Sequence, residues 1–264
     1  MTAVSRTSCI HTSRAQSFNS AAAEYAAHRP SYPPALFDAI EELAGRPLTG
    51  ARVADVGAGT GIGTALLQER GADVIAVEPG DGMAAQFRLG HPGLPIVRGT
   101  GDALPLAAAS LDVLTYAQAW HWTDPARAVP EARRVLRTGG ALALWWNTSP
   151  LDVPWIADQA RRIAAGFGDL GGLPTVELNG DGARAALADP TGTLDFAHRL
   201  VRWSRHVPLD THLANLASHS IFLVAGPERA DVFFTDERRH LLETFPDGTV
   251  EEIYDVELLV AITA

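Results

Sequence analysis

The chain has 264 residues, of which 47% are hydrophobic and 20% are charged. Its formal charge of −10 would repel a phosphate backbone, so we expect no nucleic-acid partner. No run of about 18 apolar residues occurs, so we expect no membrane partner and place the protein in the cytoplasm. The single cysteine, Cys9, excludes a disulfide within the chain and a zinc site built from cysteines.

The N-terminal region divides into a polar leader and a helical stretch. Residues 1–17 lack the apolar run of a secretory signal, so we expect a flexible leader. Residues 18–44 have a helical pattern that Pro30, Pro33 and Pro34 interrupt.

Strand and helix patterns then alternate up to residue 146. We expect strands at 52–56, 73–77, 95–98, 111–116 and 141–146, and helices at 62–70, 82–89 and 126–136. Apolar strands separated by helices are typical of a parallel sheet that is covered on both faces. The sequence therefore predicts an α/β fold, a Rossmann-like seven-stranded, mainly parallel sheet with helices on both faces and a helical lid.

The pattern is looser after residue 147. We expect a helix at 154–167, a helix at 211–223 with Asp210 as its N-cap, a further helix from 236, and a last, antiparallel strand at 250–262. The predicted organisation is a leader (1–17), a cofactor-binding core with N-terminal cap helices (18–147), a lid or substrate-binding insertion (148–225), and a final helix and strands that complete the sheet (226–264).

A glycine-rich turn, Asp55-Val56-Gly57-Ala58-Gly59-Thr60-Gly61, follows the first strand and opens a helix. Gly57 and Gly59 allow a tight turn and a close approach of a ligand to the backbone. A plain strand-to-helix turn is the alternative interpretation of this segment taken alone.

Acidic residues follow the next two strands. Glu78 ends the second strand, where a carboxylate can accept hydrogen bonds from both hydroxyls of a ribose. Asp102, beside Ala103, follows the third strand and can accept from an adenine amino group. Either acid alone is explained equally well as a solvated strand end, but the three features in order predict an adenosine cofactor.

Asp55 decides between a dinucleotide and S-adenosylmethionine. A carboxylate at this position would repel a pyrophosphate, whereas it suits the ammonium group of a methionine moiety, directly or through water. This favours S-adenosylmethionine. An NAD(P)-dependent oxidoreductase on a similar fold and a cofactor-binding protein without turnover are the alternatives.

Several segments together resemble class I S-adenosylmethionine-dependent methyltransferases, in particular the small-molecule group of trans-aconitate methyltransferase-like proteins. The segments are FNSAAAEYAAHRPSYP (18–33), VADVGAGTG (53–61), VIAVEPGDGM (74–83), GTGDALPL (99–106), LDVLTYAQAWHW (111–122) and ARRVLRTGGALAL (132–144). The resemblance is strong over residues 18–147 and weak beyond them.

Besides Asp55, the resemblance implies a set of cofactor-binding residues: Arg29, Gly57, Ala58, Gly59, Glu78, Pro79, Met83, Asp102, Ala103 and Gln118. Arg29 and Tyr25 would cap the site, with Arg29 near the methionine carboxylate or an acid on the substrate. Asp102 departs from the group, which more often has Glu there, and its shorter side chain would reach adenine through water.

Aromatic residues mark the expected acceptor pocket. Ligands of open parallel sheets lie beyond the carboxyl ends of the strands. We therefore expect Tyr32, Trp120 and Trp146 to bind the substrate and His121 and Tyr25 to act in catalysis. His121 could serve as a general base, as a hydrogen-bond donor or as a metal ligand, and structural orientation of its loop is the alternative. For Trp122 and Trp145 we prefer core packing.

Four histidines, His198, His206, His212 and His219, gather in a segment with few other motifs. His212 and His219 would stand about 10.5 Å apart on one helix, too far for one metal ion unless the helix breaks. We therefore consider His121, His206 and His219 as ligands of a divalent metal such as Zn²⁺, with solvated or packed histidines as the alternative.

The sequence predicts an S-adenosylmethionine-dependent methyltransferase that acts on a small metabolite bearing a carboxylate. Two reactions fit this prediction: metal-assisted C-methylation of a 2-oxo acid, and O-methylation of an acid.

Overall fold

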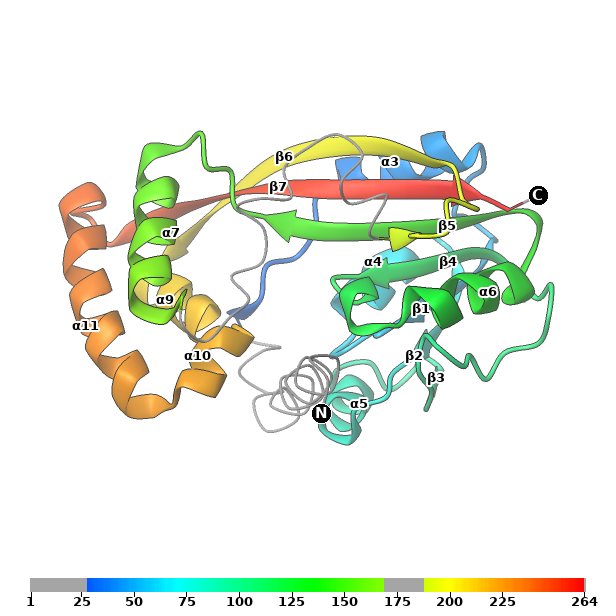
Figure 1. Ribbon diagram of the computed structural model, residues 1–264, viewed down its shortest axis with the longest axis horizontal. Coiled ribbons are helices and arrows are strands. Elements are labelled where there is room, and N and C mark those ends of the chain that lie inside the picture. Colours follow the sequence, from blue (N-terminus) through cyan, green and yellow to red (C-terminus); the bar gives the residue numbers. More distant parts are fainter. Residues whose placement is uncertain (1–27, 169–187, 264) are drawn as a thin grey trace. The chain divides into compact units, whose positions relative to one another are not determined.

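Helices and strands alternate in the computed structural model, which describes residues 28–168 and 188–263 (Figure 1). The strands are β1 (Arg52–Val56), β2 (Asp73–Val77), β3 (Ile96–Val97), β4 (Leu111–Ala117), β5 (Leu136–Thr148), β6 (Phe196–Pro208) and β7 (Thr249–Ile262). The helices are α3 (Pro34–Ala44), α4 (Ile62–Glu69), α5 (Asp81–Gly90), the 3₁₀ helix η1 (Trp120–Trp122), α6 (Pro125–Val135), α7 (Pro154–Phe167), α9 (Leu209–Ala217), α10 (Ser220–Ala225) and α11 (Pro227–Thr244). The predicted leader, the helical stretch before residue 28 and Tyr25 lie outside the described residues.

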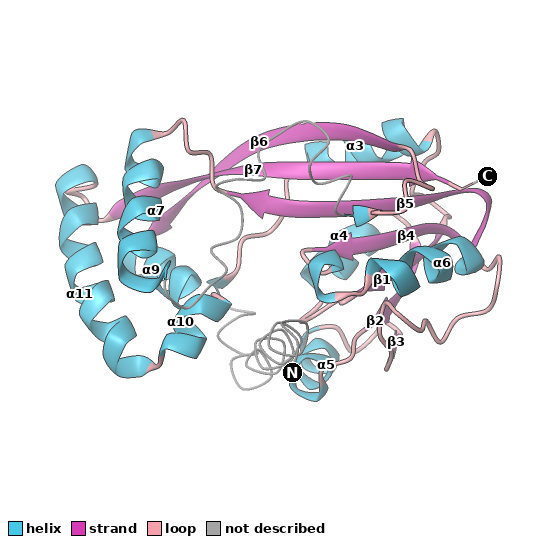
Figure 2. Cartoon of the chain, in the orientation of Figure 1, coloured by secondary structure: helices cyan, strands magenta, loops and turns pink. Residues whose placement is uncertain are grey.

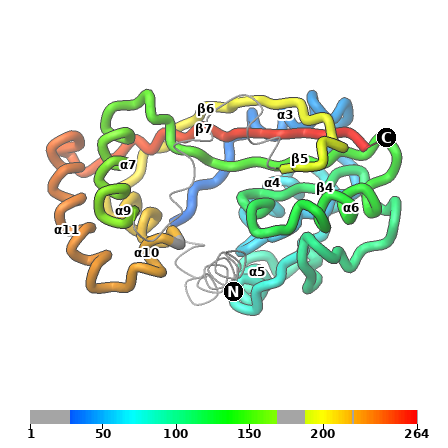
Figure 3. The backbone as a smooth tube through the Cα atoms, viewed as in Figure 1, coloured from blue at the N-terminus to red at the C-terminus, as the bar shows by residue number. Residues whose placement is uncertain are grey.

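The strands form one seven-stranded sheet in the order β3-β2-β1-β4-β5-β7-β6. Neighbouring strands from β3 to β5 are parallel. Gly139 donates a backbone hydrogen bond to Thr263, and Thr263 donates one back to Gly140, so the start of β5 lies against the end of β7. β7 therefore runs antiparallel to β5, as its path in Figure 3 shows. The predicted α/β sheet, mainly parallel and with an antiparallel last strand, is confirmed.

The strand β6 was not predicted from the sequence. Along this strand, partly or fully buried residues such as Val201, Trp203 and Val207 alternate with exposed ones, which is the pattern of a strand with one solvated face. This alternation is hard to recognise in the sequence, because charged residues also occupy positions on the buried face of the strand. Arg205 is one of them, and it pairs with Glu252 of β7 at 2.6 Å.

Consecutive residues of a strand point to opposite faces of the sheet, and Trp145 and Trp146 of β5 show this clearly. Trp145 is fully buried and meets the rings of Tyr32 and Phe37 edge to face. Trp146 belongs to the apolar cluster that includes the buried side of α6. The sheet is thus covered by α3 on one face and by α6 on the other, and the preferred packing role of Trp145 is confirmed.

The described residues fall into two compact units. The core unit consists of 31–147, 188–201 and 256–263, and the helical unit consists of 28–30, 148–168 and 202–255. β6 and β7 supply residues to both. Within the helical unit, α7, α9, α10 and α11 (Figure 2) bury a separate apolar cluster that includes Phe167, Leu213 and Phe222.

Three predicted elements have clearly different bounds in the structure. The helix expected from 236 is part of α11, which begins at Pro227. The helix expected at 211–223 is broken: α9 ends at Ala217, and His219 is the N-cap of α10. The fifth strand starts at Leu136 rather than at 141 because its first residues pair with β4 and β7. Among the described residues, no helix is long and apolar enough to cross a membrane.

Candidate functional site

The strand order reverses direction between β1 and β4, and ligands of such sheets bind beyond the carboxyl ends of the strands at this point. The glycine-rich turn leaves β1 here, and the segment of Gln118 and Ala119 leaves β4. The two segments touch, since a Cβ atom added to Gly57 would lie 2.5 Å from the Cβ atom of Ala119. The fold therefore brings together two of the predicted cofactor-binding segments.

The turn depends on backbone angles that favour glycine. Gly57, Gly59 and Gly61 have φ angles of +67°, +58° and +99°. Gln118, on the facing segment, also has a positive φ of +59°, which is uncommon for a residue with a side chain. Such strained backbone persists only where the surrounding structure holds it, and it clusters at functional sites.

Glu78 is joined to the glycine-rich turn by a hydrogen bond. Its Oε2 accepts from the backbone nitrogen of Gly59 at 2.8 Å, and its Oε1 accepts from that of Gly80 at 2.7 Å. Burial raises the pKa of the Glu78 carboxyl, although these two N–H groups oppose the shift. A carboxylate has about four acceptor positions, so both oxygens retain capacity for ligand hydroxyls.

Asp55 is fully buried beneath the turn. The hydroxyl of Thr64 on α4 donates to its Oδ2 at 2.6 Å, and that of Thr115 on β4 donates to its Oδ1 at 3.0 Å. Burial raises the pKa of Asp55 to about 6 against these two bonds. Asp55 thus ties α4 and β4 together under the turn. Neither threonine was predicted from the sequence to lie at the site, although Thr115 is the polar residue in the otherwise apolar stretch 113–117 of β4.

The other predicted cofactor-binding residues of the core unit differ in exposure. Ala58 and Met83 are buried, Pro79 and Ala103 are exposed, and Asp102 is half-buried. The Oδ1 atom of Asp102 accepts from the backbone nitrogen of Asp124 at 2.9 Å, so this carboxylate also orders the loop that leads into α6.

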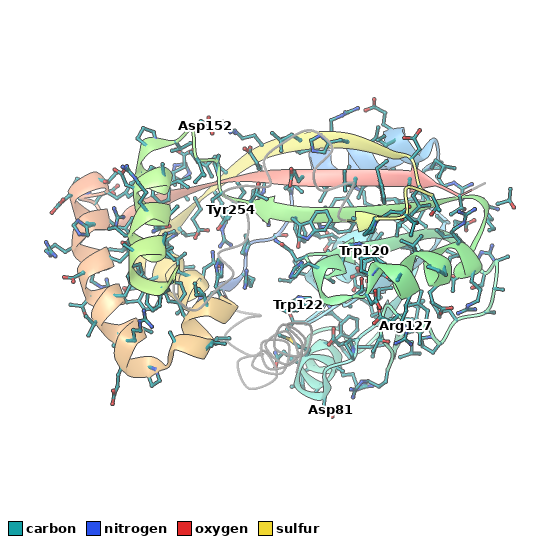
Figure 4. The ribbon with its side chains drawn as sticks, in the orientation of Figure 1. Asp81, Trp120, Trp122, Arg127, Asp152 and Tyr254 are labelled. Atoms are coloured by element: carbon teal, nitrogen blue, oxygen red, sulfur yellow. The ribbon has the colours of Figure 1, made fainter. Side chains whose placement is uncertain are left out.

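Of the predicted acceptor residues, Trp120 and His121 lie on η1, which follows β4, and Trp146 lies near the end of β5. Tyr32 precedes α3 and packs against Trp145. Figure 4 labels Trp120 and Trp122, which flank His121 in the sequence. Trp120 is buried, with its indole nitrogen donating to the carbonyl of Ala188 at 3.1 Å, and the His121 side chain is exposed. The indole nitrogen of Trp146 lies 3.2 Å from Nδ1 of His121. The structure therefore brings His121 and Trp146 together, which the sequence did not predict.

Arg29, His206 and His219 belong to the helical unit. A guanidinium nitrogen of Arg29 donates to the carbonyl of Ser218 at 3.4 Å, and His206 is exposed on β6. Burial lowers the pKa of His219 well below its usual range, and the nearby Arg29 contributes. His219 is therefore neutral at physiological pH.

A buried polar network in the helical unit centres on His212. Its Nδ1 lies 2.8 Å from Glu252 of β7, and its Nε2 lies 3.0 Å from the amide nitrogen of Gln159 on α7. That amide also donates to Glu237 of α11 at 2.9 Å. Burial alone would raise the pKa of Glu252, but the His212 hydrogen bond and the charge of Arg205 outweigh it and hold the pKa at about 2. The histidine is therefore part of a packed network that joins four elements, α7, α9, α11 and β7.

The predicted metal site gains no support from the side-chain arrangement. Within residues 28–168 and 188–263, no group of three or more His, Cys, Asp or Glu side chains is arranged to hold a metal ion. His206 and His219 have the surroundings described above, and His121 is engaged by Trp146. A bound divalent metal stays a prediction from the sequence.

The chemistry of the site fits S-adenosylmethionine. Glu78 is an acceptor group beside the turn, Asp55 is a second carboxylate beneath it, and together they disfavour a pyrophosphate. The hydroxyl of Thr60, in the turn itself, is buried and has no hydrogen-bond partner among the described residues. A ligand with hydroxyl groups and a positive charge matches this set of groups.

Comparisons with known proteins agree with this assignment. Residues 54–144 match the family model of a methyltransferase domain. An uncharacterized methyltransferase of Mycobacterium tuberculosis is 36% identical over 238 residues, which cover 90% of each chain. A malonyl-[acyl-carrier protein] O-methyltransferase of Methylococcus capsulatus is 39% identical over 99 residues, which cover 35% of this chain and 36% of that one. The solved structure of a putative type II methyltransferase from Anaeromyxobacter dehalogenans superimposes with a TM-score of 0.63 at 26% identity and covers 89% of this chain and 96% of that one.

The chain belongs to the S-adenosylmethionine-dependent methyltransferases. Family membership decides against the NAD(P)-dependent oxidoreductase and implies S-adenosylmethionine as the methyl donor. The narrower resemblance to the trans-aconitate group stays a prediction from the sequence.

Proposed function

We propose that this methyltransferase acts on a small metabolite that bears a carboxylate group. The observation that carries the proposal is the exposed imidazole of His121, held by Trp146 next to the point where the strand order reverses. An imidazole there can bind an acceptor oxygen by a hydrogen bond. The resemblance to trans-aconitate methyltransferase-like proteins supports an acid, as does the relative named for O-methylation of malonyl-[acyl-carrier protein].

In this proposal the core unit holds the cofactor through the side chain of Glu78 and the backbone of Gly57 to Gly59, with Asp55 supporting the turn from below. Ala58, Pro79, Met83, Asp102, Ala103 and Gln118 complete the proposed set. When bound, S-adenosylmethionine supplies an electrophilic methyl group on a sulfonium, so orientation of the acceptor provides most of the acceleration.

The acceptor side of the proposal consists of His121, Trp146, Trp120 and Tyr32. Arg29 and Tyr25 remain predictions from the family resemblance, and location in the cytoplasm remains a prediction from the composition of the sequence. Arg29 would bind a carboxylate of the cofactor or of the acceptor by charge-assisted hydrogen bonds.

The test is turnover of S-adenosylmethionine to S-adenosylhomocysteine with a panel of carboxylic and 2-oxo acids, each with and without a chelator. We expect turnover of at least one small acid and no effect of the chelator. Turnover only of neutral acceptors such as phenols or quinones would contradict the proposal. Loss of activity with chelator, restored by Zn²⁺ or Fe²⁺, would instead support metal-assisted C-methylation. His121→Ala is the control, because turnover that depends on this site should be strongly reduced in this variant.

A further inference from the structure

The hydrogen bond between Trp146 and His121 fixes the proton on one nitrogen of the imidazole. An indole N–H is only a donor, so Nδ1 of His121, 3.2 Å away, must accept with its lone pair. The ring is then neutral, and its single proton lies on Nε2.

Trp146 is well placed to impose this state. Its side chain is 8% exposed and packs in the apolar cluster of β4, β5 and α6, so the indole cannot turn away without disturbing the core. His121, in contrast, is exposed and also contacts the ring of Trp122, with 4.6 Å between centroids. The rigid partner therefore sets the tautomer of the exposed one.

This tautomer limits what the imidazole can do. A general base needs a lone pair directed at the proton that it removes, but Nε2 carries a proton and Nδ1 is engaged by Trp146. Coordination of a metal ion through Nε2 would likewise require the other tautomer. The N–H group on Nε2, in contrast, can donate a hydrogen bond to a methyl acceptor that is already an anion and has no proton to lose.

We infer that His121 positions the acceptor as a hydrogen-bond donor through Nε2–H, that Trp146 is the positioning residue that fixes this state, and that the attacking atom is a carboxylate oxygen. This inference rests on the proposed function. An oxygen of the carboxylate attacks the methyl carbon with a lone pair while His121 donates to the other oxygen; the carbon–sulfur bond breaks with its electrons moving to sulfur, and a methyl ester and neutral S-adenosylhomocysteine result. The reaction requires no proton transfer and therefore no base.

The tautomer is measured without any substrate. In the ¹⁵N-labelled protein at alkaline pH, couplings of the ring nitrogens to the carbon-bound protons distinguish the two neutral forms, and His121→Gln assigns the signal. We expect His121 to be in the Nε2–H form alone, and the Nδ1–H form to appear in Trp146→Phe. Trp122→Phe is the matched control, because it removes an indole that contacts His121 through its ring, and it should leave the tautomer unchanged. A substantial Nδ1–H population in the unmodified protein would overturn the inference.

Kinetics separate a donor from a base. Glutamine places an amide N–H near the position of Nε2, whereas alanine has no donor, and neither can accept a proton. With a turned-over acid, we expect His121→Gln to keep kcat/KM within about tenfold and His121→Ala to lose about a hundredfold. A general base would instead make both variants equally inactive, by about 10²–10⁴-fold.

The product gives the last readout, because a methyl ester is hydrolysed by mild alkali and a C-methylated acid is not. An alkali-stable product would overturn the inference while leaving the proposed acid substrate intact. If no acid is turned over at all, both the proposed function and the ester-forming step fail, and the tautomer measurement still shows whether Trp146 fixes His121.

Discussion

The carboxylate of Glu78 and the backbone nitrogen of Gly59 are 2.8 Å apart, so the acid that directly follows β2 holds the glycine-rich turn that leaves β1. Two features that the sequence presents as separate signals are therefore one unit in the structure. The group proposed to bind the ribose is also the group that shapes the turn, and a change at Glu78 should affect both.

Glu78→Gln should weaken binding of S-adenosylmethionine by about 10- to 100-fold. The amide NH₂ group would face a backbone N–H group, and one oxygen that accepts a hydrogen bond from the ligand would be lost. Calorimetric titration with S-adenosylmethionine and with S-adenosylhomocysteine measures this. Asp73→Asn is the matched control, because Asp73 is exposed at the opposite end of β2. Equal affinities of Glu78→Gln and the unmodified protein would exclude Glu78 from the cofactor site.

Gly57→Ala and Gly50→Ala separate backbone strain from steric clash. Both glycines have a positive φ, +67° and +72°, but an added Cβ atom at Gly50 meets nothing within 4 Å. Gly50→Ala should therefore cost about 1–2 kcal/mol of unfolding free energy from strain alone. Gly57→Ala should cost about 1–3 kcal/mol more, because its Cβ atom would collide with Ala119. Urea denaturation gives both values, and equal losses would contradict the close packing of the two segments.

Asp55 should make the protein less stable as the pH rises. Its pKa of about 6 in the folded protein lies above the ordinary value of 3.8, so the folded state binds the proton more tightly. The contribution of Asp55 to stability is then highest below about pH 4 and falls as the pH rises through 6, by up to about 3 kcal/mol. Asp55→Asn removes this contribution. The unfolding free energy of the variant should therefore rise relative to that of the unmodified protein from pH 5 to pH 8. If the two unfolding free energies change with pH in parallel, the raised pKa is refuted.

Glu252 should contribute in the opposite direction. Because its pKa is held at about 2, it stabilises the folded protein above about pH 4.5, and this stabilisation is lost as the pH falls toward 2. Glu252→Gln should cost about 2–4 kcal/mol at pH 7, since it leaves the half-buried charge of Arg205 without its carboxylate partner. Glu251→Gln is the control, because adjacent residues of β7 point to opposite faces. Losses of the same size in both variants would show that the network contributes nothing specific.

The order of strands and helices in the first 147 residues could be predicted from the sequence. Apolar runs such as 52–56 and 73–77, each followed by glycine or an acid, reflect local constraints: a buried parallel strand must be apolar, and a turn with positive φ requires glycine. The same constraints indicated the cofactor, because the glycines and acids that shape the ends of these strands are also the groups proposed to bind S-adenosylmethionine. β6 was missed because its partner on one side is β7, which is distant in the sequence, and charged residues interrupt its apolar alternation.

The sequence by itself therefore determined the fold class and the kind of cofactor, which depend on periodicity and on glycines and acids at strand ends. Only the tertiary structure decided which polar groups meet. Thr64 and Thr115 converge on Asp55, and Trp146 binds Nδ1 of His121, across separations of 9, 60 and 25 residues. The physical reason is that a hydrogen bond depends on distances of about 3 Å and on direction. Such geometry arises only when strands far apart in the chain are packed side by side.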